Sequence, residues 1–267
     1  MIHSRAVPPV GVPISVVSAA LPEGSRLRDG VIALGNFDGF HRGHRLLIGT
    51  ARRIAATRRP VAIMSVEPHP RQFFATPGTA PFRLATAAQK LRAAQGIGLG
   101  YLFQPAFDAE FAGLSPEAFI ETVLHARLGV SHVVVGADFR FGAKRAGDCR
   151  LLADLCLRHD IGVTLVPLQG GFSSSAVRAA LRAGDLEAAC ASLGRTWQVE
   201  LVARPEVTQP GSLQGWALAP ELIRPPAGRY LIRAEGKESV IDLTAEGCLM
   251  GASGPVPRWI EILARCR

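Results

Sequence analysis

Two histidines at a spacing suited to joint chemistry, His41 and His44, lie in the segment 35–44, which reads GNFDGFHRGH. An apolar run, Val31–Leu34, precedes this segment and another, Leu46–Ile48, follows it, which predicts a strand, a turn and the start of a helix. Residues three apart at a helix start share one face, beside free backbone N–H groups and the positive end of the helix dipole. Such a position binds phosphate.

The turn between the predicted strand and helix consists of Gly35, Asn36, Phe37, Asp38 and Gly39. Glycines allow sharp backbone bends and the close approach of a bulky ligand. A histidine pair beside this turn can neutralise charge on a triphosphate that undergoes displacement at its α-phosphorus. We therefore interpret the chain as a nucleotidyltransferase whose turn binds the nucleotide. Asn36 and Asp38 are candidate contacts for ATP or Mg²⁺, although Asp38 can alternatively serve as a turn cap.

The composition of the chain argues against several other classes of protein. Its 267 residues allow one large or two ordinary domains, and 48% apolar residues suffice for a sizeable core. Because the chain contains no long apolar run, we expect no membrane span and no secretory signal. The net charge of +8 comes from scattered arginines with only 6% aromatic residues, which argues against nucleic acid as a partner. Five dispersed cysteines predict a reduced, cytoplasmic protein without a zinc site.

Apolar runs alternate with helical patterns through the first part of the chain. This alternation predicts an α/β fold with a Rossmann-like parallel sheet, flanking helices and an active site at the carboxyl ends of the strands. The expected strands are Ile14–Val17 at an edge, Val31–Leu34, Val61–Val66, Leu99–Phe103, Val133–Gly136 and Val163–Pro167. The expected helices are Gly43–Thr57, Thr86–Ala94, Pro116–Arg127, Cys149–His159, Ser175–Ala183 and Leu186–Leu193.

The character of the chain changes near Arg195, where prolines begin to separate short β-like pieces such as Trp197–Val202 and Arg229–Arg233. We predict two domains, a nucleotidyltransferase domain over 1–194 and a small β-rich domain over 195–267.

Six sequence blocks, in order, resemble the prokaryotic bifunctional riboflavin kinase/FAD synthetase family, specifically its N-terminal FMN adenylyltransferase module. The blocks are GNFDGFHRGH at 35–44, VEPHPRQFF at 66–74, PFRL at 81–84, FAGLSPE at 111–117, VGADFRFG at 135–142 with RAGD at 145–148, and SSSAVR at 173–178. One block can arise by chance, whereas six in order are specific. The resemblance implies transfer of AMP from ATP to FMN, giving FAD and diphosphate, with Mg²⁺ held mainly by the ATP phosphates.

The resemblance also implies roles for individual residues in catalysis and ATP binding. The expected catalytic set is His41, His44, Asp138 and Arg178. Three serines before a helix supply hydroxyls and a cap, so Ser174 and Ser175 are expected to bind ATP together with the guanidinium of Arg178. The family often carries a basic residue where this chain has Gly171, so one phosphate contact is missing or comes from elsewhere.

The flavin ring needs a flat apolar surface, which rigid prolines and aromatic rings provide. The residues expected to bind it are Pro68, His69, Pro70, Phe139 and Phe141. Each has a structural alternative, because the two phenylalanines can belong to the core and His69 can support a loop.

The segment after Arg195 resembles the family's second module, a small β-barrel riboflavin kinase, only weakly. No Pro-Thr pair and no asparagine follow Arg195, whereas the kinase signature contains Pro-Thr-Ala-Asn. We expect a truncated, degenerate kinase barrel and an FMN adenylyltransferase without riboflavin kinase activity. The alternatives are a full bifunctional enzyme, a related enzyme with another phosphorylated acceptor, and a non-catalytic regulator that binds a flavin or nucleotide. The oligomeric state stays open.

Overall fold

The computed structural model describes residues 14–167, 170–204, 212–250 and 257–266. The chain forms two compact units, and it passes between them more than once. The first unit comprises residues 1–37, 43–77 and 91–169, and the second comprises residues 38–42, 78–90 and 170–267.

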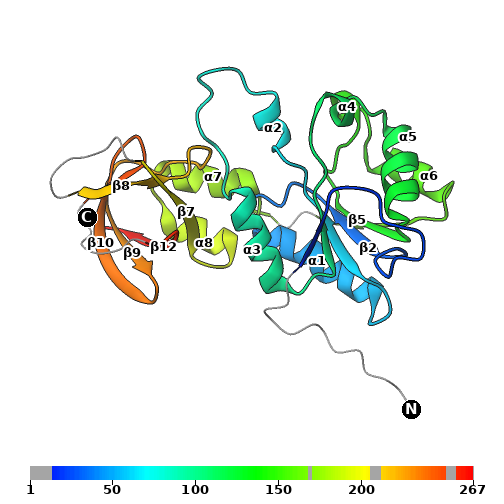
Figure 1. Ribbon diagram of the computed structural model, residues 1–267, viewed down its shortest axis with the longest axis horizontal. Helices are drawn as coiled ribbons and strands as arrows, with labels where there is room; N and C mark the ends of the chain where they lie inside the picture. Colours follow the sequence, from blue (N-terminus) through cyan, green and yellow to red (C-terminus); the bar gives the residue numbers. More distant parts are fainter. Residues whose placement is uncertain (1–13, 168–169, 205–211, 251–256, 267) are drawn as a thin grey trace, which may run out of the picture. The chain divides into compact units, whose positions relative to one another are not determined.

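A six-stranded parallel sheet forms the centre of the first unit (Figure 1). Its strands are β1 (Ser15–Val17), β2 (Val31–Leu34), β3 (Val61–Met64), β4 (Tyr101–Phe103), β5 (His132–Gly136) and β6 (Gly162–Val166). They lie in the order β1-β4-β3-β2-β5-β6, with β2 paired to both β3 and β5. Every residue of β2 is buried, as expected for a strand covered on both faces of a parallel sheet.

Helices connect these strands, and several are short. They are α1 (Arg42–Ala55), α2 (Pro70–Phe73), α3 (Ala87–Ile97), α4 (Ala109–Ala112), α5 (Pro116–Ala118), a π-helix (Phe119–Leu128), a 3₁₀ turn (Ala143–Arg145) and α6 (Cys149–Leu157). The Ser115 hydroxyl accepts the Ala118 N–H at 3.1 Å and caps α5, whose first residue is Pro116. None of the helices in the described ranges has the length and hydropathy that a membrane span needs.

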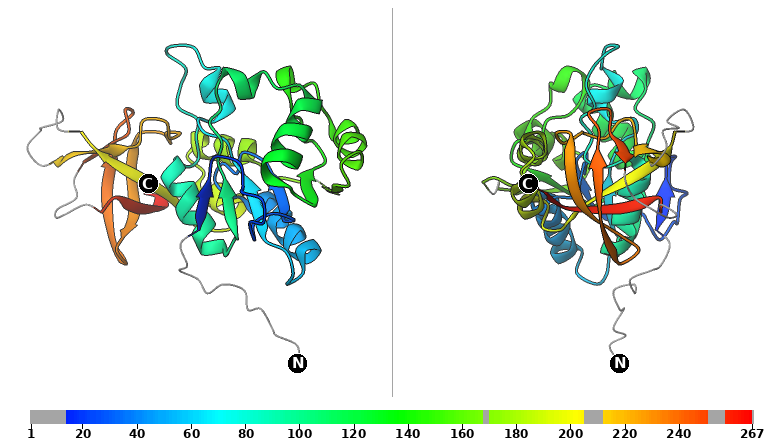
Figure 2. Two further views of the ribbon diagram at one scale, coloured as in Figure 1. Left: turned by 45° about the vertical axis from the view of Figure 1, so that its right-hand side comes forward. Right: turned by 90° about the vertical axis from the view of Figure 1, so that its left-hand side faces the viewer.

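An antiparallel barrel and two helices form most of the second unit. The helices are α7 (Ser174–Ala183) and α8 (Leu186–Leu193). The barrel strands are β7 (Trp197–Ala203), β8 (Ser212–Leu218), β9 (Gly228–Ala234), β10 (Lys237–Leu243), β11 (Cys248–Met250) and β12 (Trp259–Arg265). They close in the order β10-β11-β8-β7-β12-β9, because β9 also pairs with β10; Figure 2 shows them from yellow to red.

One hydrophobic core joins α7 and α8 to the barrel strands, since Val177, Leu181 and Leu193 pack in the same cluster as Val199 and Ile262. Two helices expected in the nucleotidyltransferase domain therefore belong to the same compact unit as the barrel. The expected domain boundary at residue 194 stays a prediction.

The predicted fold class is confirmed, with both the parallel sheet and the β-rich domain in place. The edge strand expected at Ile14–Val17 is β1, which pairs in parallel with β4. The continuous helix expected at Pro116–Arg127 is instead α5 followed by the π-helix. In the second unit, the helix expected to begin at Thr86 begins at Ala87, because Thr86 is its cap: the Thr86 hydroxyl accepts the Gln89 N–H at 3.1 Å.

Candidate active site

The parallel sheet places two loops at its topological switch point. Chain order reverses at β2, which lies between β3 and β5, and ligands of such sheets bind outside the carboxyl ends of the strands at this point. Asn36 follows β2 and Asp138 follows β5, and both side chains are exposed. The Ser65 hydroxyl, just past β3, donates to the Asn36 carbonyl oxygen at 2.9 Å and ties two neighbouring strand ends together.

The backbone of the turn after β2 adopts left-handed conformations at several residues. Gly39 has φ +86°, and the non-glycine residues Phe37 and Phe40 have φ values of 47° and 48°. Left-handed backbone is costly for phenylalanine and persists where surrounding structure enforces it, often at functional sites. Both phenylalanine side chains are fully buried and thereby anchor the turn.

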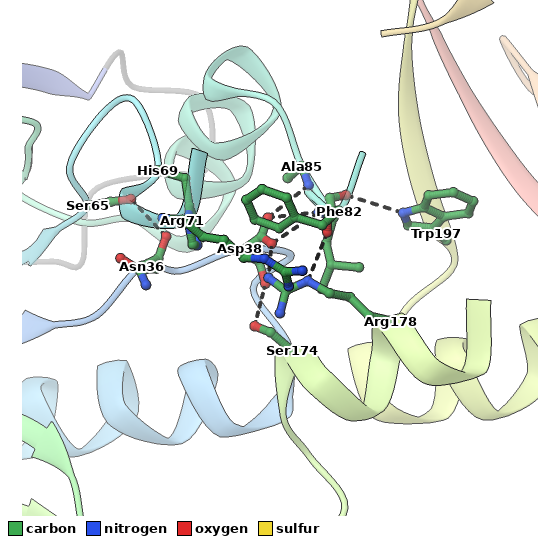
Figure 3. A network of polar contacts seen from close by, with 11 residues as sticks. Asn36, Asp38, Ser65, His69, Arg71, Phe82, Ala85, Ser174, Arg178 and Trp197 are labelled. Atoms are coloured by element: carbon green, nitrogen blue, oxygen red, sulfur yellow. Dashed lines mark hydrogen bonds and ion pairs between the residues drawn. The ribbon is translucent and has the colours of Figure 1, made fainter. Parts of the chain in front are cut away.

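The carboxylate of Asp38 is the most heavily bonded group of the turn, at only 1% exposure. Within the second unit it accepts the Leu84 N–H at 2.9 Å and 3.1 Å and the Ala85 N–H at 3.1 Å. It also pairs with the Arg178 guanidinium at 2.6 Å (Figure 3). These partners compensate a buried charge that would otherwise be costly. Asp38 therefore organises the second unit, and a direct contact with ATP or Mg²⁺ stays a prediction.

Arg178 is held from three directions by the second unit. Besides the Asp38 pair, its Nε–H donates to the Phe82 carbonyl oxygen at 2.8 Å. Its guanidinium lies over the Phe82 ring, 5.4 Å from the centroid. The side chain is 12% exposed. This arrangement fixes a positive charge within α7, one helical turn from the serines that begin that helix.

His41 is buried beside the same ion pair. Burial lowers the pKa of His41 from 6.5 to about 4; the Asp38 carboxylate opposes this shift and the Arg178 guanidinium adds to it. The imidazole is therefore neutral near pH 7 and carries one N–H donor. A phosphate brought next to it favours the charged form, because an anion stabilises imidazolium.

His44 lies in the first turn of α1 and is half-buried. Its ring packs against the Phe37 ring, with centroids 4.9 Å apart and an interplanar angle of 36°. Phe37 thus supports the His44 ring, and its contact with the nucleotide stays a prediction.

The serine block begins α7, one residue earlier than predicted. Ser173 is the cap, since its hydroxyl accepts the Ala176 N–H at 3.1 Å. The Ser174 hydroxyl donates to the Asp38 carbonyl oxygen at 3.2 Å, and Ser175 is exposed. Within the second unit, the start of α7 thus lies next to the 38–42 loop and provides helix N–H groups suited to an anion.

The Pro-His-Pro block caps helix α2 in the first unit. The His69 Nδ1 accepts the Arg71 N–H at 3.1 Å, and Pro70 is the first helical residue. His69 is buried, so the structure gives it the loop-supporting role that the sequence left open; its contact with flavin stays a prediction. Pro68 is exposed beside it.

A series of phenylalanine rings runs from α2 to the loop after β5. Neighbouring ring centroids lie 5.4 to 6.2 Å apart, in contact range for aromatic pairs. Its members are Phe73, Phe107, Phe111, Phe119, Phe141 and Phe139. The series links the two blocks expected to bind flavin, and the sequence did not predict a role for its three middle rings. The one sequence signal for the series is that phenylalanines recur between those two blocks.

The ends of this series differ in exposure. Phe74, which packs on Phe73 at 5.0 Å, is 67% exposed, whereas Phe141 is buried in the core of the first unit. Phe139 is half-buried and stacks on Phe141 with an interplanar angle of 11°. Phe141 is thus a core residue, and its contact with flavin stays a prediction, whereas Phe139 and Phe74 present ring surface.

Arg42 and Phe172 are two further residues of the second unit whose contact the sequence did not predict. The Arg42 guanidinium lies over the Phe172 ring, 5.2 Å from its centroid. Arg42 follows His41, and Phe172 follows Gly171 and precedes the serine block. The Arg42 guanidinium thus brings a positive charge to Phe172, the residue next to Gly171, where the family often carries a basic side chain.

The described residues contain no cluster of three or more histidine, cysteine, aspartate or glutamate side chains with the geometry of a metal site. The described cysteines are free thiols, and burial raises the pKa of Cys156 to about 12.

A parallel sheet with connecting helices and a topological switch point at β2 defines the Rossmann-like class of α/β folds. The chain belongs to the FAD synthetase family, whose model matches residues 24–176, more than half of its length.

Relatives are found among both single-function and bifunctional proteins. A bifunctional riboflavin kinase/FMN adenylyltransferase of Escherichia coli K12 is 40% identical over 174 residues, covering 63% of this chain. An FAD synthetase of Listeria monocytogenes is 35% identical over 188 residues, covering 68% of this chain and 75% of its own length. The bifunctional protein of Bacillus subtilis is 32% identical over 216 residues, covering 77% of this chain and 67% of its own length. The chain spans only 55% of the length of the E. coli protein.

One solved structure supports the fold over nearly the whole chain. It is titled a macrolide-efflux protein from Streptococcus pneumoniae, and it matches with a TM-score of 0.74 at 19% identity. The match covers 96% of this chain and 91% of that protein. At this identity it bears on the fold alone.

The buried, neutral His41 predicts a loss of stability in acid. Because its pKa is lower in the folded state, the unfolded chain binds the proton first, so the contribution is complete above pH 6.5 and is lost as pH falls towards 4. At pH 5 the loss is about 2 kcal/mol. The unfolding free energy of wild type and of His41→Gln is measured at pH 7.5 and at pH 5. Between these two pH values, wild type should lose more unfolding free energy than His41→Gln by this amount. His132, whose pKa burial also lowers, is present in both chains and cancels. Equal slopes would contradict the assignment.

Proposed function

We propose that this chain is an FMN adenylyltransferase, which transfers AMP from ATP to FMN and releases diphosphate. The observation that carries the proposal is the grouping of His41, Ser174 and Arg178 around Asp38 in a member of the FAD synthetase family. An FMN phosphate oxygen attacks the α-phosphorus of ATP, and the bond from that phosphorus to the bridging oxygen of diphosphate breaks. Such a transfer is accelerated by alignment and charge neutralisation, without a covalent enzyme intermediate.

The second unit supplies the groups suited to the ATP phosphates. The neutral imidazole of His41 donates an N–H, the start of α7 offers backbone N–H groups, and Arg178 adds a fixed positive charge. In the first unit, His44 is a candidate for a further N–H donor. Arg42 is the residue best suited to replace the cation missing at Gly171, since the Phe172 ring holds its guanidinium next to the serine block.

The loops of the first unit supply the surface suited to flavin. Pro68 and Phe74, which follow β3, are exposed, and Phe139, which follows β5, is half-buried; each offers apolar surface of the kind that an isoalloxazine ring needs. The exposed carboxylate of Asp138, next to Phe139 in the chain, is the candidate polar anchor.

Magnesium enters this proposal together with ATP. The Asp38 oxygens are already engaged by protein donors, which favours a Mg²⁺ ion carried mainly by phosphate oxygens. The ion neutralises charge on those phosphates.

Incubation of the purified chain with FMN, ATP and Mg²⁺ should yield FAD and diphosphate, separated by chromatography. Other phosphomonoesters offered in place of FMN should react at least a hundredfold more slowly, because they lack the ring that the aromatic surface recognises. A chain that binds ATP by calorimetry yet forms no FAD would be a regulator. Faster reaction with another acceptor would reassign the substrate.

Substitution of His44 by alanine should lower kcat by about a hundredfold, because one donor to the developing phosphate charge is lost. Binding of ATP should change far less. The matched control is His125→Ala, which removes an exposed histidine outside the site. Steady-state FAD formation by both variants checks this, and near-normal turnover in His44→Ala would remove His44 from the mechanism.

The chain is expected not to phosphorylate riboflavin. A kinase must hold ATP·Mg²⁺ with suitable oxygen donors and deprotonate the ribityl hydroxyl, and the chain offers no asparagine after Arg195. Chromatography of riboflavin incubated with ATP and Mg²⁺ tests this, with the bifunctional E. coli relative as the positive control. Formation of FMN by the purified chain would instead support a bifunctional enzyme, an alternative favoured by the closed barrel.

A further inference from the structure

Residues 82–89, here called the strap, contact both the 38–42 loop and the barrel within the second unit. Leu84 illustrates this arrangement. Its N–H donates to the Asp38 carboxylate, and its carbonyl oxygen accepts the Trp197 indole N–H at 3.3 Å. A single residue thus connects the loop that carries His41 to barrel strand β7.

The backbone of the strap also pairs directly with the connection after β8. The Arg83 N–H donates to the Glu221 carbonyl oxygen at 3.0 Å, and the Ile223 N–H donates to the Arg83 carbonyl oxygen at 2.8 Å. Arg83 and Leu222 form a parallel bridge. The strap is therefore an extension of the barrel as much as a loop of its own.

A buried carboxylate of the barrel completes the attachment. Glu200 of β7 is 7% exposed, and it accepts a hydrogen bond from the Thr86 hydroxyl. Its other oxygen accepts the Arg258 Nε–H at 2.7 Å. The Gln89 side-chain amide donates to the Gln198 carbonyl oxygen at 2.6 Å. A buried carboxylate is stable only when donors satisfy its oxygens. Loss of the Thr86 hydroxyl therefore destabilises the buried, charged Glu200 side chain.

Packing transmits the position of the strap to the loop. Leu84 and Trp197 are each 1% exposed and belong to one core cluster with Leu193. A Cβ on Gly39 would lie 3.0 Å from Leu84 Cδ1 and 3.3 Å from Leu193 Cδ2, so the loop backbone rests directly on these side chains. The Arg195 guanidinium also donates to the Gly39 carbonyl oxygen at 3.1 Å.

We propose that the barrel serves adenylyl transfer, with Trp197 and Glu200 as positioning residues that act through the strap on Asp38 and hence on His41 and Arg178. This inference rests on the function proposed above. It gives the β-rich domain a role in the transfer reaction that needs no kinase chemistry.

Two substitutions test the proposal with little change in shape. Trp197→Phe removes the indole N–H and keeps a ring in the core. Thr86→Val removes the hydroxyl that Glu200 accepts, and Thr86→Ser restores it. The matched control is Tyr230→Phe, because Tyr230 is a fully buried barrel residue whose hydroxyl donates to the Pro226 carbonyl oxygen at 2.6 Å, away from the strap.

FAD formation is the first measurement. Trp197→Phe and Thr86→Val should lower kcat at least fivefold and raise the KM for ATP at least threefold, with the KM for FMN within twofold. Thr86→Ser should recover most of the lost rate, and Tyr230→Phe should match wild type. Wild-type kinetics in Trp197→Phe and Thr86→Val, or an equal loss in Tyr230→Phe, would overturn the proposal.

Hydrogen exchange of the Leu84 and Ala85 amides is the second measurement and needs no activity. Exchange should accelerate at least tenfold in Trp197→Phe and Thr86→Val and stay unchanged in Tyr230→Phe. Unchanged exchange in the first two variants would refute the link from the barrel to Asp38. If the wild-type chain formed no FAD, the function proposed above would fail, while accelerated exchange would still establish that the barrel holds the Asp38 loop.

Discussion

The buried carboxylate of Asp38 is the constraint on which the organisation of the second unit depends. Two strap N–H groups and the Arg178 guanidinium satisfy it, so three separate segments of the chain must meet at one point. A buried anion without these donors would cost several kcal/mol. The positions of His41 and of the start of α7 follow from this meeting, since both contact or adjoin the same residue.

The strap lies between two buried carboxylates, and it meets them with different donors. Towards the 38–42 loop it offers backbone N–H groups, which cannot be removed by a change of side chain other than to proline. Towards the barrel it offers the Thr86 hydroxyl, which depends on the side chain at that position. The contact with the 38–42 loop is thus the more tolerant of substitution in the strap.

The sequence predicted what depends on local pattern and left out what depends on distant partners. The strand Val31–Leu34 and the glycine-rich turn were recoverable because periodicity and turn chemistry are local signals. The role of Asp38 was not recoverable, because its partners lie 46 and 140 residues along the chain and its burial leaves no local trace. Barrel closure and the aromatic series likewise depend on contacts between residues far apart in the chain. The role of Glu200 could not be predicted for the same reason, because its partners Thr86 and Arg258 are distant in sequence.

The chain passes between its compact units at residues 37/38, 42/43, 77/78, 90/91 and 169/170. A barrel so interwoven with the segments 38–42 and 78–90 is not a cassette that recombination can exchange at one junction. A gene encoding a foreign barrel would have to supply compatible partners for Leu84 and Thr86, or acquire them by compensating substitutions. Positions 84 and 197, and positions 86 and 200, are therefore expected to vary together as lineages diverge, which ties the evolutionary history of the barrel to that of the 38–42 loop.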